Sequence, residues 1–224
     1  MTPDEIATRL RARAERHDGQ PRWWVESATD EPEAAIAAAA RELGLVMTRR
    51  MYQLRRELPL ERDLVASIPT IPIRSFRPGQ DDGPWLAVNN AAFRWHPDQG
   101  GWTETQLEQR MAEPWFDPAG FLITQSDGHI AGFCWTKVHP TDPPIGEIYV
   151  IGADPTHQGH GLGAALTVAG LEWLWSHRHT PVAMLYVEST NSGALRLYDR
   201  LGFTRDHTDI CFELRSNNSA EQAR

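Results

Sequence analysis

The sequence predicts an α/β protein with a mixed α+β sheet, in which one complete domain follows half of a related domain. Three observations support this class: short apolar runs that alternate with helical patterns, a glycine-rich loop between one such run and a helix, and an internal repeat. The 224 residues are enough for one large domain plus a fragment. Because 41% of the residues are hydrophobic, the chain can bury a core.

The first 70 residues predict two helices and two strand segments. Ile6, Leu10 and Ala14 fall on one face of a helix over 4–17. Gly44 is a natural stop for the second helix. After the first helix we expect a short strand at 23–26, a helix at 33–43, one or two strands at 45–54 and a proline-rich linker at 59–70.

The rest of the chain predicts a longer alternation of strands and helices. Asp127-Gly128 between two apolar runs is typical of a hairpin turn, and Thr103 can cap the helix that begins at Glu104. The expected strands lie at 71–76, 120–125, 129–138, 147–151, 182–188 and 203–214, the expected helices at 84–93, 104–111, 162–177 and 192–201, and a polar, disordered tail at 216–224.

An internal repeat relates the start of the chain to its end. Trp24-Val25-Glu26-Ser27 matches Tyr186-Val187-Glu188-Ser189, and each segment precedes a helix that ends in Leu-Gly. Each copy then closes with an aromatic residue, one further residue and a leucine. We therefore expect 1–58 to be the second half of a domain whose complete copy spans 71–215, and the half domain to lack a glycine loop.

Charge and composition narrow the classes of function. The net charge of −8 argues against broad nucleic-acid binding, which needs a basic surface. No apolar run approaches the roughly 20 residues that span a bilayer, and no signal peptide is visible. Cys134 and Cys211 lie far apart in expected strands, so we expect two buried thiols and no disulfide framework. We therefore expect a cytoplasmic protein with no membrane partner.

The loop Gln158-Gly159-His160-Gly161-Leu162-Gly163 joins an expected strand to an expected helix. Glycine lets backbone N–H groups turn towards an anion, and the N-terminus of a helix adds a favourable dipole. The alternative is a glycine-rich surface turn. The strand before the loop and the helix after it favour a phosphate site.

Two spaced motifs follow successive strands: Gln158-x-x-Gly161-x-Gly163 and Asn191-x-x-Ala194-x-x-x-Tyr198-x-x-x-Gly202-Phe203. Together they resemble the GNAT acyltransferase superfamily. The resemblance implies a GNAT fold, acetyl-CoA as co-substrate and direct attack of an amine on the thioester. Further segments resemble a branch of the superfamily with two tandem GNAT domains, which acetylates the cysteinyl amine of a glucosaminyl-inositol: 89–93, 96–102, 115–118, 135–140 and 185–189.

The resemblance also implies a role for each matching residue. Glu147 would accept a proton from the amine, and Tyr198 would protonate the departing CoA thiolate. The substrate-binding positions are Asp98, Lys137, Glu147 and Tyr186. The cofactor-binding positions are Ile151, Gly152, Ala153, Gln158, Gly159, His160, Gly161, Leu162, Gly163, Ala164, Asn191, Ser192, Gly193, Ala194, Leu195 and Arg196.

Each of these roles has a plainer alternative. Taken alone, Glu147 and Lys137 indicate solvated charges at strand ends, Tyr198 a core aromatic and Tyr186 an ordinary strand aromatic. The histidines show no recognisable set of four ligands, so we assign no metal. The alternative functions are acetylation of a protein N-terminus or another small amine, and acyl-CoA binding without catalysis. We expect a monomer, or a dimer if the first domain is truly truncated, because its exposed sheet edge must then be covered.

Overall fold

A computed structural model describes residues 14–17, 20–96 and 98–214. Contacts divide the chain into two compact units. The first unit comprises 1–54, 186–195 and 205–224, and the second comprises 55–185 and 196–204. Each unit combines segments that are far apart in the sequence, and the boundaries between the units fall inside secondary-structure elements.

The first unit is a sheet with one helix. Its strands lie in the order β1 (Ala14–His17), β2 (Gln20–Ser27), β9 (Thr204–Leu214) and β3 (Leu45–Glu57). The helix α2 (Ala34–Glu42) is rich in alanine, a strong helix former, and its chain reverses at Gly44, where φ is 70°. The core of this unit consists of Ile36, Ala39, Ala40, Leu45, Ile210 and Phe212.

The predicted helix over 4–17 is wrong in its described part, because residues 14–17 form the strand β1. Residues 1–13 lie outside the described residues. The hairpin register pairs His17 with Gln20 and Ala14 with Trp23, so the backbone of β1 pairs with β2. Sheet pairing thus outweighs the weak helical pattern of this segment, as tertiary context often does. The predicted tail at 216–224 also lies outside the described residues.

The second unit is a mixed sheet with strands in the order β8 (Val182–Glu188), β7 (Ile145–Ala153), β6 (His129–His139), β5 (Phe121–Ser126) and β4 (Arg74–Ser75). β7 and β8 are parallel, and the other neighbours are antiparallel. Asp127 and Gly128 form the predicted hairpin turn with φ of 50° and 80°. Residues 186–188 of β8 belong to the first unit.

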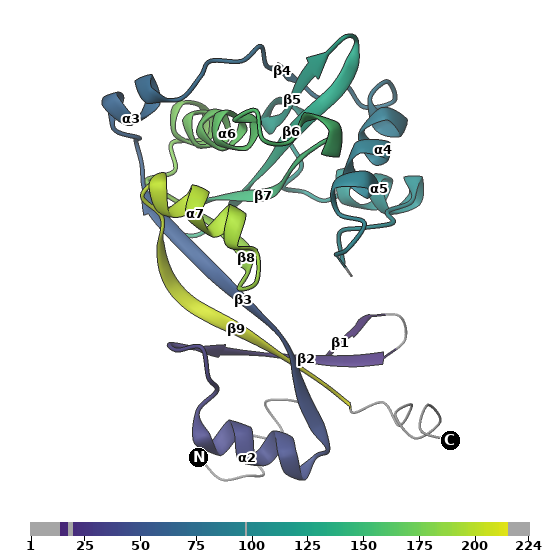
Figure 1. Cartoon of the computed structure of the whole chain (residues 1–224), viewed down its shortest axis with the longest axis vertical. Coiled ribbons are helices and arrows are strands. Elements are labelled where there is room, and N and C mark those ends of the chain that lie inside the picture. Colours follow the sequence, from purple (N-terminus) through teal and green to yellow (C-terminus); the bar gives the residue numbers. More distant parts are fainter. Residues whose placement is uncertain (1–13, 18–19, 97, 215–224) are drawn as a thin grey trace. The chain divides into compact units, whose positions relative to one another are not determined.

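Helices cover both faces of this second sheet (Figure 1). On one face α4 (Asp82–Ala92) and α5 (Glu104–Met111) pack on Phe133 and Trp135. On the other face α6 (Leu162–Arg178) passes so close to Cys134 that a Cβ at Gly170 would lie 2.6 Å from its sulfur. Successive residues of a strand point to opposite faces, so Phe133 and Trp135 face α4 and α5 while Cys134 faces α6. The aromatic core includes Trp85, Trp102, Leu107, Phe121, Phe133 and Trp135.

Two segments of this unit differ from the sequence prediction, and a third matches it. The expected linker contains the short helix α3 (Arg62–Ser67), and the expected strand at 71–76 pairs only at Arg74–Ser75. The N-terminus of α5 is capped as predicted, since Thr103 and Gln106 form a reciprocal capping box. The remaining elements are the helix α7 (Ser192–Arg200) and the single-turn helices η1 (Pro118–Gly120) and η2 (Pro155–His157).

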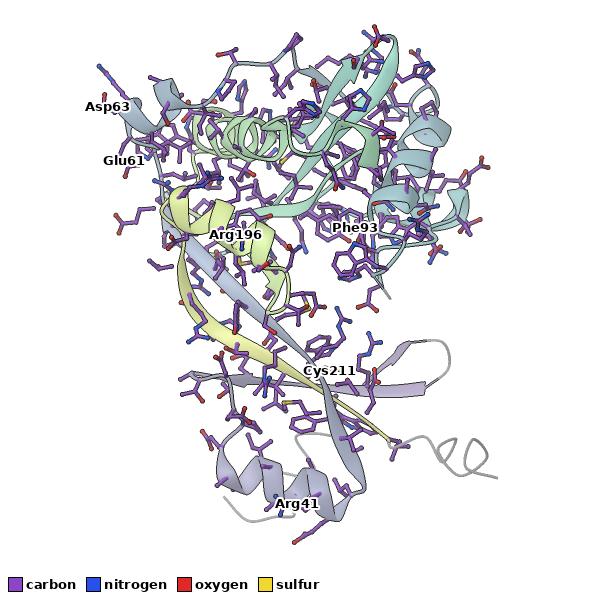
Figure 2. All side chains as sticks on the ribbon, viewed as in Figure 1. Arg41, Glu61, Asp63, Phe93, Arg196 and Cys211 are labelled. Carbon is purple, nitrogen blue, oxygen red and sulfur yellow. The ribbon has the colours of Figure 1, made fainter. Side chains whose placement is uncertain are left out.

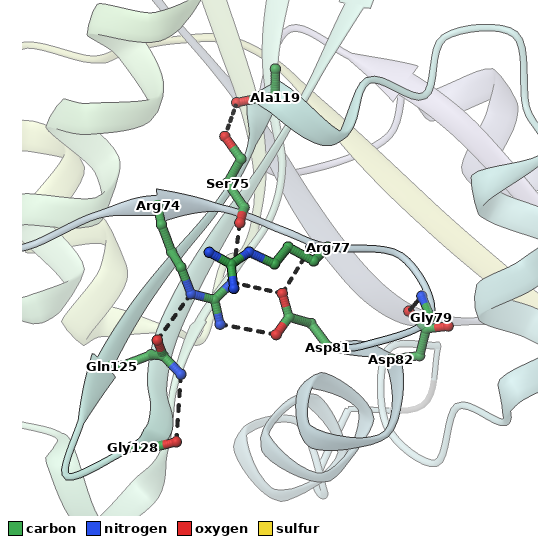
Figure 3. Close-up of polar contacts among 9 residues, drawn as sticks. All are labelled: Arg74, Ser75, Arg77, Gly79, Asp81, Asp82, Ala119, Gln125 and Gly128. Carbon is green, nitrogen blue, oxygen red and sulfur yellow. Dashed lines mark hydrogen bonds and ion pairs between the residues drawn. The ribbon is translucent and has the colours of Figure 1, made fainter.

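An ion pair ties β4 to the start of α4 (Figure 3). The guanidinium of Arg74 donates two hydrogen bonds to Asp81, at 2.6 and 2.9 Å, and the backbone N–H of Arg77 donates a third at 2.8 Å. Burial by itself would raise the pKa of the Asp81 carboxyl, but these hydrogen bonds outweigh it and hold the pKa below its usual value. The contact explains how so short a strand is anchored.

Candidate active site

The strand β7 loses one of its two neighbours halfway along its length. Its parallel pairing with β8 runs from Ile145 to Ile148, whereas its pairing with β6 continues to Ala153. The register on the β6 side shifts between these points, so that Tyr149 is an extra, bulged residue. Bulges twist a strand and end pairing, and they often occur beside active sites. Past Ile148, no described strand pairs with β7 on its β8 side.

The predicted cofactor-binding backbone at 151–153 lies on this half-paired part of β7. Gly152 packs directly on aromatic rings: a Cβ there would lie 3.0 Å from Phe133 and 3.1 Å from Phe93, which Figure 2 labels. A larger residue would therefore displace the strand or the rings. The rings support the strand from one side and leave its edge available for hydrogen bonding.

The glycine loop follows β7 through η2. The side chain of Asp154 accepts a hydrogen bond from the backbone N–H of Thr156 at 2.8 Å, and the hydrogen bonds from Thr156 lower the pKa of Asp154. Gly159 and Gly161 have φ of 82° and 80°, with nothing within 4 Å of an added Cβ. It is therefore the left-handed backbone, and not lack of space, that favours glycine at both positions.

The backbone N–H groups of residues 158–164 donate no hydrogen bond to any described residue. Gly161 is the N-cap of α6, and Ala165 is the first residue to donate back to it, at 3.2 Å. The start of α6 is fixed from inside, since Thr167 Oγ1 donates to the carbonyl of Gly163 at 2.7 Å. Seven successive amides beside a helix N-terminus can bind an anion such as a pyrophosphate.

Glu147 is a buried carboxylate on β7, with its side chain 8% exposed. Its Oε2 lies 2.7 Å from Nε2 of His139 and 3.7 Å from Nζ of Lys137. Lys137 is directly opposite Glu147 in the β6–β7 ladder, and His139 is two residues further on the same face. The structure therefore brings Glu147 and Lys137 together, and neither is a fully solvated charge.

Lys137 also faces two aromatic rings that pack against each other, with their centres 4.9 Å apart. Its Nζ is 5.1 Å from the ring centre of Trp115 and 5.5 Å from that of Tyr149. Cations bind to the faces of such rings. Burial raises the pKa of the Tyr149 phenol, so it stays neutral at physiological pH. The ammonium of Lys137 is therefore held by one charge and two rings.

Tyr198 is buried on α7, and its ring contacts that of Phe203 at 5.7 Å. Its hydroxyl donates no hydrogen bond to the described residues. Burial is the main cause of its raised pKa, and the nearby thiol of Cys134 adds to the shift. A phenol with a raised pKa keeps its proton at neutral pH, so the hydroxyl of Tyr198 is present as a donor.

Asn191 has a local structural task at the start of α7. Its side-chain oxygen accepts the backbone N–H of Ala194 at 3.1 Å, and its carbonyl accepts that of Leu195 at 3.0 Å. This is an N-cap, which stabilises the helix. Asn191–Leu195 belong to the first unit, whereas Arg196, exposed and labelled in Figure 2, belongs to the second.

The remaining predicted substrate residues lie in different units. Tyr186 belongs to the first unit, where its hydroxyl accepts a hydrogen bond from Gln53 Nε2 at 2.7 Å. Asp98 belongs to the second and is exposed. The backbone of Asp98 is fixed, because its N–H donates to His96 Nδ1 at 3.1 Å and its carbonyl accepts from Trp102 Nε1 at 3.0 Å.

Sequence reasoning did not find three side chains that surround Glu147 and Lys137: His139, Trp115 and Tyr149. His139 follows Lys137 by two residues in a strand, a spacing that places both on one face. That signal was present in the sequence. The contacts of Trp115 and Tyr149 with Lys137 depend on packing between distant segments and had no local signal.

One group of described residues has the spacing of a metal site: Glu26, His207 and Asp209 in the first unit, whose ligand atoms all lie within 4.8 Å of one another. None of these three residues is among the predicted site residues. In the part of the chain that the structure describes, no helix is both long and apolar enough to cross a membrane.

A family model for the acetyltransferase (GNAT) family matches residues 85–203, which contain Glu147, the glycine loop and Tyr198. The chain belongs to the GNAT family. The resemblance inferred from the motifs is thereby confirmed, and so is the predicted mixed α/β fold of this family. Among solved structures, a GCN5-related N-acetyltransferase from Sphaerobacter thermophilus has the same fold, with a TM-score of 0.67 and 21% identity, covering 88% of this chain and 61% of that one.

Curated GNAT relatives are more specific. The chain is 54% identical over 178 residues to a mycothiol acetyltransferase from Acidimicrobium ferrooxidans, covering 78% of this chain and 57% of that protein. It is 47% identical over 205 residues to a mycothiol acetyltransferase from Thermomonospora curvata, covering 91% of this chain and 67% of that one. The chain thus spans little more than half the length of the first relative.

Proposed function

We propose that this GNAT chain carries the acyl-transfer site of a mycothiol acetyltransferase in the cytoplasm. Its substrates would be acetyl-CoA and the cysteinyl amine of 1D-myo-inosityl 2-(L-cysteinylamino)-2-deoxy-glucopyranoside, in the last step of mycothiol biosynthesis. The observation that carries the proposal is that buried Glu147 pairs with Lys137 of β6, while its own strand, β7, leads into the loop of unpaired amides. Similarity to the curated relatives supports the choice of substrate.

Acetyl-CoA would bind along β7 and the loop after it. The pyrophosphate would accept hydrogen bonds from the amides of residues 158–164, helped by the dipole of α6. The pantetheine arm would pair with the free edge of β7 at 151–153, as a neighbouring strand does. One N–H of that edge would also stabilise the oxyanion that forms on the thioester carbonyl.

The transfer would be direct, within a complex of both substrates. Glu147 accepts a proton from the substrate ammonium, the free amine attacks the thioester carbon, and the C–S bond breaks. Tyr198 then donates its phenolic proton to the CoA thiolate. Neither cysteine suits an acyl carrier, because both are buried and burial raises the pKa of each thiol.

The substrate would be held by the ion pair of Glu147 and Lys137 and, as the resemblance implies, by Asp98 and Tyr186. Lys137 presents a positive charge to hydroxyl or carbonyl oxygens, while Asp98 and Tyr186 offer an acceptor and a phenol. A sugar–inositol conjugate with an ammonium group provides partners for all three kinds of group. Trp115 and Tyr149 cover one side of the Lys137 ammonium and so limit the directions from which it is reached.

The decisive test is an acetylation assay with the cysteinyl glucosaminyl-inositol, followed by CoA thiol release and by mass spectrometry of the product. We expect turnover in the unaltered chain. In Glu147→Gln we expect kcat to fall about 100-fold, because the amide cannot accept the proton. Calorimetry should show unchanged binding of acetyl-CoA, since the loop amides are intact.

The matched control is Glu172→Gln, which removes an equivalent charge from α6 in the same unit. We expect this control to keep wild-type kcat. Equal kcat in Glu147→Gln and the control would contradict the base role. Turnover of peptide or small-amine substrates in a panel, with none of the cysteinyl precursor, would favour one of the alternative acetyltransferase functions instead.

A further inference from the structure

The imidazole of His139 forms one ion pair in the described part of the chain, with the carboxylate of Glu147. The distance between Nε2 and Oε2 is 2.7 Å, which is a short hydrogen bond. No other hydrogen bond or ion pair involves this imidazole among the described residues. The His139 side chain is 29% exposed, so it exchanges protons with solvent while Glu147 beside it does not do so freely.

Both polar contacts of Glu147 fall on the same oxygen. His139 and Lys137 each approach Oε2, while the described residues make no polar contact with Oε1. A buried carboxylate is stable only when hydrogen-bonded or paired, and these two contacts meet that need. The arrangement leaves one oxygen fixed and the other available to receive a proton.

We propose that His139 is the positioning residue of the base Glu147, an inference that rests on the proposed function. Neutral His139 donates from Nε2 to Oε2 and fixes the carboxylate while leaving it basic. The substrate N–H bond then breaks and an O–H bond forms at Oε1, and His139 keeps its own proton. When His139 is protonated, its charge stabilises the carboxylate and makes it a weaker base. Activity therefore requires neutral His139.

The other charged and titratable groups near the pair do not mimic this behaviour. Lys137 on β6 is a cation and Tyr149 on β7 is a neutral phenol. Arg110 on α5 and Glu113 after it act on Tyr149 through space. Ammonium, guanidinium, phenol and carboxyl groups ordinarily titrate outside pH 5 to 8, whereas imidazole titrates within it. A fall in kcat between pH 8 and pH 5 that disappears when residue 139 is changed can therefore be assigned to His139.

The experiment compares kcat of wild type, His139→Gln and His139→Ala from pH 5.5 to 9, with both substrates saturating. Glutamine offers an N–H donor at a similar reach but carries no titratable charge. We expect His139→Gln to keep wild-type kcat at pH 8.5 within about threefold. Between pH 8.5 and pH 5.5, the kcat of the wild type should fall by a factor about ten times larger than the kcat of His139→Gln.

We expect His139→Ala to lose at least about tenfold in kcat at every pH, because the carboxylate loses its orienting donor, and to keep the KM for acetyl-CoA. If His139→Ala does not fold, the pH dependence of kcat in His139→Gln still tests the inference. The inference would be overturned if kcat of His139→Gln fell towards acid pH as steeply as kcat of the wild type, or if His139→Ala kept the kcat of the wild type. Absence of wild-type turnover would instead overturn the proposed function.

Discussion

At the scale of single residues, burial decides which candidate roles are physically reasonable. Glu147 and Lys137 form an ion pair whose side chains are largely withdrawn from water, and such pairs hold their geometry better than surface ones. Tyr198 combines a packed ring with a hydroxyl that no described residue uses. The plainer interpretation of Tyr198, a core aromatic, is thus compatible with the acid role.

Replacement of Tyr198 by phenylalanine should separate these two roles. The ring of Tyr198→Phe still fills the core, and no described partner of the hydroxyl is left unsatisfied. We therefore expect the thermal midpoint of unfolding to change by less than about 2 °C. We expect kcat to fall about 100-fold, because the thiolate loses its proton donor. An unchanged kcat would show that Tyr198 serves packing alone.

At the scale of elements, the bulge in β7 and the loop after it form one continuous stretch of backbone, to which we assign acetyl-CoA in our proposal. The bulge at Tyr149 ends pairing with β8, and the free edge runs on to the amides before α6. The first helical turn of α6 lies close to α7, since a Cβ at Gly163 would be 3.3 Å from Leu197. Two helices and a strand thus position the loop without help from its own side chains.

A single methyl group at Gly161 should disturb this edge. Its φ of 80° costs an alanine about 1–2 kcal/mol, so the loop of Gly161→Ala is expected to relax away from its anion-binding shape. We expect the dissociation constant of acetyl-CoA, measured by calorimetry, to rise about tenfold.

Gly83→Ala is the matched control for the loop variant. Gly83 lies in α4 with no positive φ and nothing within 4 Å of an added Cβ, so alanine fits and favours the helix. Its affinity for acetyl-CoA should equal that of wild type. Equal affinities in both variants would argue that the loop does not hold the cofactor.

At the scale of the whole molecule, the two units differ in what they contribute. The second unit contains Glu147, Lys137, Tyr198 and the glycine loop. The first contains β2, α2 and β3, in the order that the internal repeat predicted for half a domain, and is completed by β9. The proposal that 1–58 is half of a GNAT domain agrees with this order, and it stays a proposal.

Each unit contains one cysteine, which allows a test across the molecule. Cys134 and Cys211 are buried, and burial raises the pKa of Cys211 to about 11 and that of Cys134 further. Because the thiolate is the reactive form, a maleimide at pH 8 should modify neither thiol in the folded protein and both in denaturant, as counted by mass spectrometry. Rapid labelling of either thiol in the folded state would contradict its burial, and acetylation of either thiol by acetyl-CoA would contradict direct transfer.

Much of the fold was predictable because its signals are local. The hairpin at Asp127-Gly128, the cap at Thr103 and the bounds of α6 and β8 follow from turn, cap and periodicity rules that act over a few residues. The strand β1 was not predictable in this way, because its conformation depends on pairing with β2 and its own pattern favours a helix.

The sequence by itself determined the family, the glycine loop and the carboxylate, lysine and tyrosine of the candidate site. These are properties of residue type and spacing, and left-handed glycines and helix starts are encoded locally. The tertiary structure decided how Glu147 is held. Its contacts with His139 and Lys137 depend on the register between β6 and β7, which shifts at the bulged Tyr149. Register is set by long-range packing of both sheet faces, so no local pattern specifies it.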